Sequence, residues 1–155
     1  MKIVVGIDGE HYTDLYYGFV ETEDEAYEWA KEDAENLECF EFEREEHNRF
    51  AGYYWLDPLY DSVPDFTIYE SYDINEKPYI LVWWHAYNGV DFKVKQFDTF
   101  EEANAVMKDE AANVYIDESA VDPDDEDNEI KPDSISACVD TGYEWEMWQI
   151  IKREV

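Results

Sequence analysis

Basic residues are scarce in this sequence. Only 11 Lys and Arg stand against 41 Asp and Glu, which gives a formal net charge of −30 at pH 7. Direct nucleic-acid binding through a basic patch is excluded by the sign of the charge, and an anionic membrane surface would repel the chain. No stretch approaches the ~20 apolar residues of a membrane span, and the start turns acidic too early for a secretory signal. We therefore expect a soluble, cytoplasmic protein.

Glycine, cysteine and histidine are also rare. Six glycines leave little material for a phosphate-binding loop. Cys39 and Cys138 form no Cys-x-x-Cys motif, so we expect two buried, reduced thiols. His11, His47 and His85 are scattered without the spacing of metal ligands, and His85, at the end of an apolar run, is expected to be structural. Since no nucleophile motif occurs and carboxylates are too abundant to single out a pair, we expect no enzyme, no metal site and no cofactor.

Aromatic residues, in contrast, are plentiful. They make up 17% of the 155 residues, and hydrophobic residues make up 45%. Disordered acidic chains are poor in aromatics, and a chain of this length can bury a sizeable core. The composition therefore predicts a folded protein in which apolar burial offsets the self-repulsion of the acidic groups.

The chain shows signs of an internal repeat. Thr22–Glu25 and Thr99–Glu102 are both Thr-x-x-Glu capping boxes, which mark helix starts, and they lie half the chain length apart. The ungapped offset that carries Thr22 onto Thr99 also places Ile3–Val5 on Ile80–Val82. Near the ends of the two halves it places Phe66 and Ile68 on Tyr143 and Trp145. The matches favour a duplication, although two common strand–helix patterns could also coincide by chance.

Each half predicts the same order of elements. Paired strands are expected at 2–7 and 15–20 and at 79–84 and 91–97, helices at 23–37 and 100–114, and one or two closing strands after each helix. Asn88-Gly89 is typical of a hairpin turn, and 121–133 reads as a loop. The sequence thus predicts an α+β fold with antiparallel sheet and two helices. Its two ββαββ-like repeats, 1–77 and 78–155, are expected to pack as one compact body.

The acidic residues gather in three places. On the first helix, Ala26, Ala30, Ala34 and Leu37 share one face, and a row of acids with Lys31 occupies the other. Residues 1–77 hold 22 acids and 5 bases, so the charge belongs to the folded body and is no acidic tail. The candidate partner-binding residues are Asp24, Glu28, Glu32 and Glu35 on the helix, the cluster Glu41, Glu43, Glu45 and Glu46, and Asp122, Asp124, Asp125, Glu126, Asp127 and Glu129 in the loop.

The loop at 121–133 invites comparison with a calcium-binding loop. Acids alternate there from Asp122 onward, but Asp127 stands where an EF-hand loop needs glycine and Asp133 where it needs a bidentate glutamate. A calcium sensor is therefore not expected, and whether this loop binds cations weakly stays open.

The total charge is comparable to that of a DNA segment of the same size. A compact chain of this length has a radius of gyration of about 15 Å, and duplex DNA of the matching length, roughly 40 Å, carries roughly 24 charges. In composition, in size and in the acidic helix face around Asp24–Glu35, the sequence resembles small acidic DNA-mimic inhibitors of phages and mobile elements, such as anti-restriction and anti-CRISPR proteins.

That resemblance implies a protein that blocks a basic DNA- or RNA-binding defence enzyme, such as a nuclease or a restriction or CRISPR effector, by mimicking nucleic-acid charge. If the chain is phage-encoded, it would act in the cytoplasm of the host cell. Two alternatives stay open. One is an immunity protein or antitoxin that neutralises a cognate toxin, and the other is an accessory protein whose acidity serves only solubility.

Overall fold

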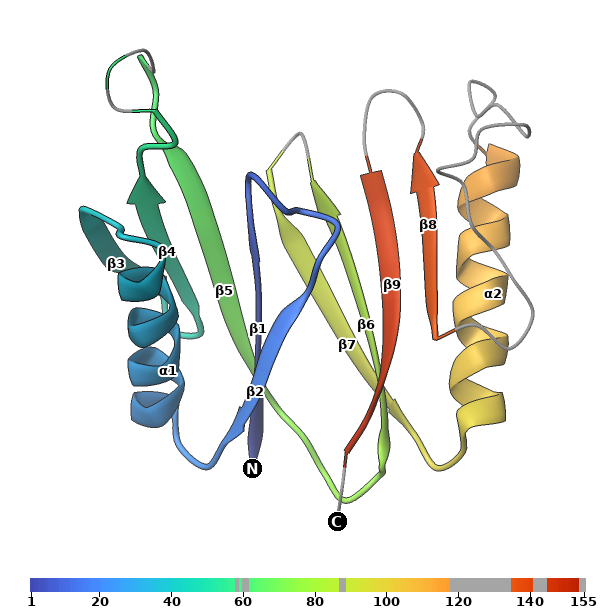
Figure 1. Ribbon diagram of the computed structural model, residues 1–155. Helices are drawn as coiled ribbons and strands as arrows, with labels where there is room; N and C mark the ends of the chain where they lie inside the picture. Colours follow the sequence, from blue (N-terminus) through green and yellow to red (C-terminus); the bar gives the residue numbers. More distant parts are fainter. Residues whose placement is uncertain (58, 60–61, 87–88, 118–134, 141–144, 154–155) are drawn as a thin grey trace. The chain divides into compact units, whose positions relative to one another are not determined.

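The computed structural model describes residues 1–57, 59, 62–86, 89–117, 135–140 and 145–153. The chain forms two compact units, Met1–Ile74 and Asn75–Val155, divided close to the boundary predicted after residue 77 (Figure 1). The first unit contains β1 (Lys2–Asp8), β2 (Tyr16–Val20), α1 (Glu23–Asn36), β3 (Glu41–Glu46), β4 (Arg49–Tyr54) and β5 (Asp65–Asp73). The second contains β6 (Tyr79–Ala86), β7 (Asp91–Phe97), α2 (Phe100–Asp117), β8 (Ser136–Asp140) and β9 (Trp145–Lys152).

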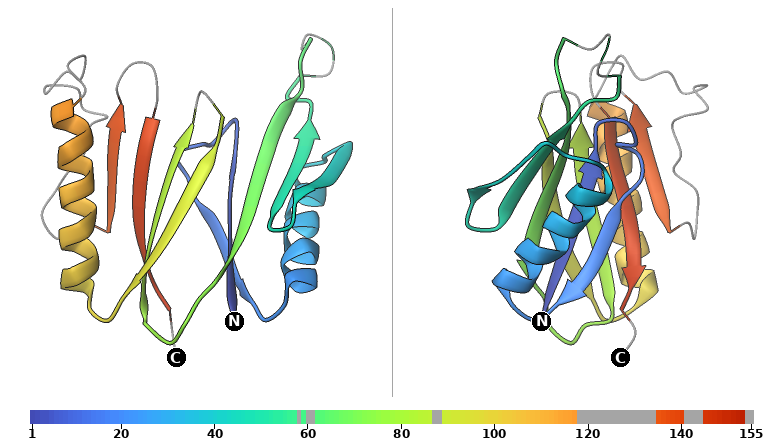
Figure 2. Two further views of the ribbon diagram at one scale, coloured as in Figure 1. Left: turned by 180° about the vertical axis from the view of Figure 1, so that it is seen from behind. Right: turned by 60° about the vertical axis from the view of Figure 1, so that its left-hand side comes forward.

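Each unit is one antiparallel sheet with one helix. The strand order is β2-β1-β5-β4-β3 in the first unit and β7-β6-β9-β8 in the second. In each unit the helix lies against one face of its own sheet (Figure 2). The predicted α+β class with antiparallel sheet and two helices is therefore confirmed. Counted from the edge formed by β2, the first four strands of the first sheet, β2-β1-β5-β4, follow the same order as β7-β6-β9-β8 in the second. Strand β3 is an additional edge strand of the first sheet.

The pairing of the strands tests the offset between the two halves. Lys2 pairs with Val20 in the first hairpin and Tyr79 with Phe97 in the second, so the offset that relates Thr22 to Thr99 holds there too. The last strand of each unit does not follow this offset. Ile7 pairs with Ile68, and Trp84, the counterpart of Ile7, pairs with Met147. The residue of β9 that corresponds to Ile68 therefore lies two positions later in the chain than the ungapped offset predicts.

The expected match of Phe66 and Ile68 to Tyr143 and Trp145 is therefore wrong. The strand pairing matches them to Trp145 and Met147 instead. Because the shift is even, each side chain keeps its face of the sheet. The shared plan agrees with a duplication, which stays a prediction.

Both helices pack on their sheets through apolar residues at helical spacing, most of them alanines. In the first unit, Ala26, Ala30 and Ala34 are buried against Val4. The equivalent positions of the second half hold Ala103, Met107, Ala111 and Leu81, which form the corresponding core of the second unit. The small alanine side chains let each helix approach its sheet closely, and they confirm the predicted inner face of the first helix.

Both helices begin where the capping boxes predict. The hydroxyl oxygen of Thr22 accepts a hydrogen bond from the backbone N–H of Glu25 at 3.1 Å, and that of Thr99 accepts from Glu102 at 3.2 Å. The Glu25 carboxylate accepts from the backbone N–H of Glu21 at 3.1 Å, one residue before the cap. Each cap satisfies a backbone donor that the helix leaves unpaired, which is typically worth about 1 kcal/mol.

Two expectations need correction. Residues 41–46, expected only as a charged cluster, form strand β3 at the edge of the first sheet. The thiols of Cys39 and Cys138 are partly exposed rather than buried. Among the residues that the structure describes, no helix is both long and apolar enough to cross a bilayer.

Candidate binding surface

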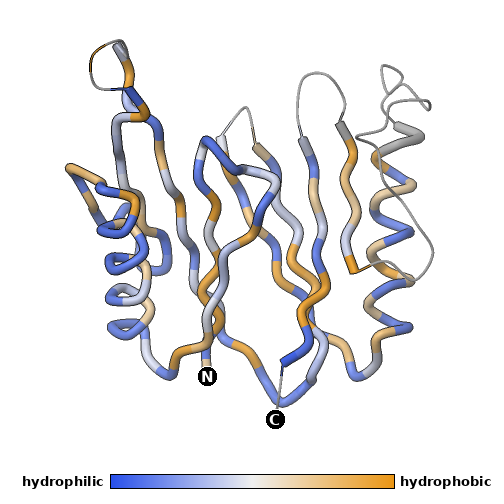
Figure 3. The backbone as a smooth tube through the Cα atoms, in the orientation of Figure 1, coloured by the Kyte–Doolittle hydropathy of each residue, from blue (hydrophilic) through white to orange (hydrophobic). Residues whose placement is uncertain are grey.

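The acidic side of α1 is a direct consequence of how the helix is buried. Because Ala26, Ala30 and Ala34 face the sheet, the opposite side of the helix faces solvent. The four predicted acids of this helix are all exposed: Asp24, Glu28, Glu32 and Glu35. We call this set the α1 acidic row. In Figure 3, α1 is coloured mostly hydrophilic, whereas α2 has more apolar positions.

The α1 acidic row has no compensating partners in the described part of the chain. None of its four carboxylates makes an ion pair or a hydrogen bond there. Two bases of the first unit pair with other acids: Lys2 with Glu23 and Asp73, and Arg49 with Glu45 and Glu70. Lys31 and Arg44 lie beside the row without forming an ion pair with it in the described part of the chain. The row therefore presents four exposed carboxylates against two nearby bases, Lys31 and Arg44.

This arrangement costs the helix some stability. Glu28 lies four residues from both Asp24 and Glu32, and like charges at that spacing repel by about 0.2–0.5 kcal/mol per pair. Glu32 and Glu35 lie toward the negative end of the helix dipole, and the last turn holds no basic residue. Asp24 lies in the first turn, where an acid suits the helix dipole, but neither packing nor helix stability explains Glu28, Glu32 and Glu35.

Two open hollows flank the row. The larger, about 710 Å³, lies along α1 and includes all four acids of the row. Its apolar wall is Val20 and the partly exposed indole of Trp29. The indole packs edge-on against Tyr69, with the ring centres 6.2 Å apart. A Cβ atom added at Gly18 would lie 2.4 Å from Nε1 of Trp29. Gly18 thus makes the room in which this indole lies beside the acids.

The second hollow, about 580 Å³, shares Asp24 and Glu28 with the first and also includes Tyr27 and Arg44. The Arg44 guanidinium lies over the Tyr27 and Phe50 rings, 5.1 Å and 5.3 Å from their centres. An arginine head group is therefore already held by aromatic faces in the hollow that Asp24 and Glu28 also line.

Glu41 and Glu43 of β3 do not extend the same surface. Phe42 packs into the core beneath α1 and Arg44 lies over Tyr27, so these two side chains point to the helix side of the sheet. Since side chains alternate along a strand, Glu41 and Glu43 point to the other side. All four predicted acids of β3 are exposed: Glu41, Glu43, Glu45 and Glu46.

Glu45 has local partners. Its carboxylate pairs with Arg49 at 3.1 Å and accepts a hydrogen bond from the Tyr53 hydroxyl at 3.5 Å. Burial, together with Glu45 and Glu43, raises the pKa of the Tyr53 phenol. Charged residues also protect an edge strand from pairing with other chains, so the β3 acids have a structural role of their own.

The third predicted group, Asp122 through Glu129, lies outside the described residues.

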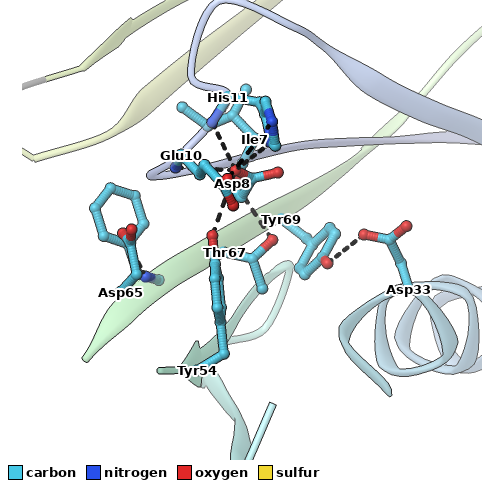
Figure 4. Close-up of polar contacts among 10 residues, drawn as sticks. Ile7, Asp8, Glu10, His11, Asp33, Tyr54, Asp65, Thr67 and Tyr69 are labelled. Atoms are coloured by element: carbon cyan, nitrogen blue, oxygen red, sulfur yellow. Dashed lines mark hydrogen bonds and ion pairs between the residues drawn. The ribbon is translucent and has the colours of Figure 1, made fainter. Parts of the chain in front are cut away.

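Sequence reasoning missed a buried polar cluster at the end of β1 (Figure 4). Asp8 is fully buried, and its Oδ1 atom accepts hydrogen bonds from the backbone N–H groups of Glu10 at 3.0 Å and His11 at 2.7 Å. The Tyr54 hydroxyl donates to the same atom at 3.4 Å. Asp8 therefore holds the turn after β1, and the Asp8-Gly9 pair at a strand end was the available sequence signal.

Asp33 lies in the same cluster and accepts a hydrogen bond from the Tyr69 hydroxyl at 2.5 Å. Burial raises the pKa of its carboxyl, Tyr69 opposes the rise, and the charge of Asp8 adds to it. Burial also raises the pKa of Tyr16 to about 12 and that of Cys39 to about 11. Within the described ranges no three Asp, Glu, His or Cys side chains are grouped to hold a metal ion. The cluster therefore reads as part of the core of the first unit.

The second unit has a similar contact between a helix carboxylate and a sheet aromatic, but there a lysine neutralises the carboxylate. Glu110, the counterpart of Asp33 in the second half, accepts a hydrogen bond from the Trp148 indole at 3.1 Å and pairs with Lys95. The aromatic–carboxylate contact between helix and sheet thus occurs in both units, but only in the second does a lysine neutralise it. The first unit carries the less compensated helix.

Comparison with known proteins identifies no relative of this chain. No family model matches the chain, and no curated protein or solved structure matches it. The argument for function therefore rests on the geometry and charge described above.

Proposed function

We propose that this protein is an inhibitor that binds a basic, nucleic-acid-handling protein through the α1 acidic row and so competes with nucleic acid. The observation that carries the proposal is the set of exposed, unpaired carboxylates on one helix face, next to open hollows with an aromatic wall. Lysines and arginines that bind phosphates would meet carboxylates there instead. Long-range attraction would make association fast and sensitive to salt.

The spacing of the row refines what is being mimicked. Acids four residues apart on a helix are separated by about 6 Å along its axis, whereas one DNA strand carries a phosphate every 3.4 Å or so. The row therefore has roughly half the axial charge density of a single strand. This favours competition for individual basic side chains over a copy of duplex geometry.

The test is a charge reversal with a matched control. Asp24→Lys, Glu28→Lys and Glu32→Lys together should leave the fold intact, because all three side chains are exposed. The control is Glu101→Lys, Glu102→Lys and Asp109→Lys on the exposed side of α2, which changes the net charge by the same amount. Both variants are compared with the wild type for binding to purified nucleases, restriction enzymes and CRISPR effectors, and for block of DNA cleavage.

We expect the α1 variant to lose at least about 10-fold in affinity at low salt, and the α2 variant to lose much less. Equal losses in the two variants would mean that net charge alone matters and that α1 is not the site. Wild-type protein that protects no DNA from any of these enzymes at low salt would overturn the proposal.

The number of targets separates this proposal from its nearest alternative. Inhibition of several unrelated DNA-binding enzymes supports charge mimicry. Neutralisation of a single cognate toxin, with no effect on other basic enzymes, supports an immunity protein, which would depend on a small patch with aromatic hot spots.

A further inference from the structure

An exposed aromatic pair lies at the junction between α1 and β3. The rings of Phe40 and Trp55 are stacked, with centres 5.6 Å apart and planes inclined by 18°. Phe40 is 53% exposed, Trp55 40% and the neighbouring Leu56 51%. The two stacked rings form a contiguous apolar surface, which on a highly charged protein marks an interaction site more often than a lone exposed residue does.

The backbone on both sides holds this pair in place. The N–H of Cys39 donates to the carbonyl of Ala34 at 3.0 Å, and the N–H of Phe40 donates to the carbonyl of Tyr53 at 2.9 Å. Tyr54, immediately before Trp55, is buried. Because the two rings also restrict each other, a partner that covers them loses little conformational entropy in ordering them.

Two exposed acidic residues flank Phe40 in the chain and restrict what can cover the aromatic pair. Glu38 and Glu41 lie on either side of Phe40 in the chain, and neither carboxylate makes an ion pair within the described residues. An apolar centre with an anionic rim is complementary to an apolar centre with a cationic rim. Nucleic acid could stack on the rings, but its phosphates would meet these glutamates.

A second copy of this chain is a poor occupant. A two-fold contact through the pair would bring Glu38 and Glu41 of one copy close to the same residues of the other. Each copy also carries a net charge of −30.

We propose that Phe40, Trp55 and Leu56 are an apolar anchor for a protein partner whose surface has an apolar centre surrounded by arginine or lysine. This inference rests on the proposed function, to which it adds the chemistry of the partner. The anchor supplies contact that a polyanion lacks, and it therefore selects a protein surface over a merely polycationic one.

The test uses two synthetic peptides of equal length and equal arginine content, one with leucine and the other with serine at the remaining positions. Their affinities for the full-length protein are measured by titration calorimetry. The variant is Phe40→Ala with Trp55→Ala. The matched control is Tyr17→Ala with Phe19→Ala, which removes another exposed aromatic pair, on β2, whose rings are 6.1 Å apart. Circular dichroism checks that both variants fold.

We expect the wild type to bind the leucine peptide about 10-fold more tightly than the serine peptide. The Phe40/Trp55 variant should lose that preference while keeping its affinity for the serine peptide, and the control variant should keep both. If Phe40→Ala with Trp55→Ala unfolds the protein, Trp55→Ser alone serves, with a reduced preference as the expected result.

Each contrary result has its own meaning. Equal affinity of the wild type for both peptides, or an unchanged preference in the Phe40/Trp55 variant, overturns the anchor and leaves the charge-based proposal standing. A serine peptide that does not bind the wild type at low salt overturns the proposed function itself. A wild-type dimer in the ultracentrifuge that dissociates in the Phe40/Trp55 variant identifies a second copy as the occupant and also overturns the inference.

Discussion

At the scale of single residues, Asp33 shows how burial and hydrogen bonding act against each other. Its carboxylate is half-buried between α1 and the sheet and accepts a hydrogen bond from Tyr69. Burial raises its pKa above 3.8 despite that hydrogen bond. The folded state therefore holds a proton on Asp33 to higher pH than the unfolded state does. Above the folded pKa, the ionised group lowers the free energy of unfolding.

Asp33→Asn should therefore stabilise the protein at neutral pH. The amide oxygen can still accept from Tyr69, and the cost of a half-buried charge disappears. The gain should shrink as the pH falls through the raised pKa and vanish below 3.8, where both states are protonated in the wild type. Urea unfolding at neutral and acidic pH measures the difference.

Asp73 provides a control of opposite sign. A hydrogen bond and charge attraction from Lys2 lower the pKa of its carboxyl. Asp73→Asn should therefore lose stability at neutral pH and lose none once the wild-type carboxyl is protonated. Should Asp33→Asn destabilise the protein at neutral pH, the Tyr69 hydrogen bond would outweigh the cost of burial.

At the scale of the elements, the end of α1 is the strained point in the first unit. Glu38, which follows the C-cap residue Leu37, has a φ of 59°. A side chain makes this left-handed conformation costly, whereas glycine adopts it readily and is the usual residue at such helix ends. The same turn places Phe40 in the exposed aromatic pair.

Glu38→Gly should therefore raise the free energy of unfolding by about 0.5–1 kcal/mol, even after the greater freedom of glycine in the unfolded chain is counted. Glu38→Ala removes the same charge but keeps the Cβ, so it should gain much less. Urea unfolding of the three proteins measures both changes. A gain as large for alanine as for glycine would trace the effect to charge and not to backbone strain.

The elements that local signals specify were predicted from the sequence. Thr22 and Thr99 fix the helix starts through short-range hydrogen bonds, and the helical spacing of Ala26, Ala30 and Ala34 fixes the buried face. Once that face is known, the α1 acidic row must be exposed. These parts of the fold and of the candidate site depend on residues within one or two turns of each other.

The features that were missed depend on contacts between distant segments. Strand β3 is polar, and Phe42 is its one side chain that enters the core, so it has no apolar alternation to detect. Only the core contact of Phe42 and the position of Arg44 over Tyr27 show that Glu41 and Glu43 point away from α1. The Asp8 cluster likewise brings together Tyr54 and Asp8, 46 residues apart, which no local pattern indicates.

At the scale of the whole molecule, the two units share the order of four strands and the position of the helix, but they differ in net charge. Residues 1–77 carry a net charge of −17 and residues 78–155 a net charge of −13. The second unit neutralises Glu110 with Lys95, whereas no carboxylate of the α1 acidic row forms an ion pair in the described part of the first unit. Solubility alone does not account for this difference in pairing between two helices of a shared plan.

Salt gives the decisive measurement at this scale, because folding and binding should respond in opposite directions. The Debye length falls from about 30 Å at 0.01 M salt to about 8 Å at 0.15 M, so added salt screens the repulsion among the acids. We expect the chain to be folded already at low salt, because both units bury an apolar core. Its melting temperature should rise by roughly 3 °C with moderate NaCl, which corresponds to about 1 kcal/mol.

Over the same range, affinity for a basic partner should fall, because salt also screens the attraction between the α1 acidic row and that partner. Calorimetric melting and binding titrations on the same samples compare the two trends. A chain that is unfolded in ordinary buffer and folds only in molar KCl would instead identify the acidity as an adaptation to salt. In that case the exposed acids of α1 would be there to hold water and not to meet a partner.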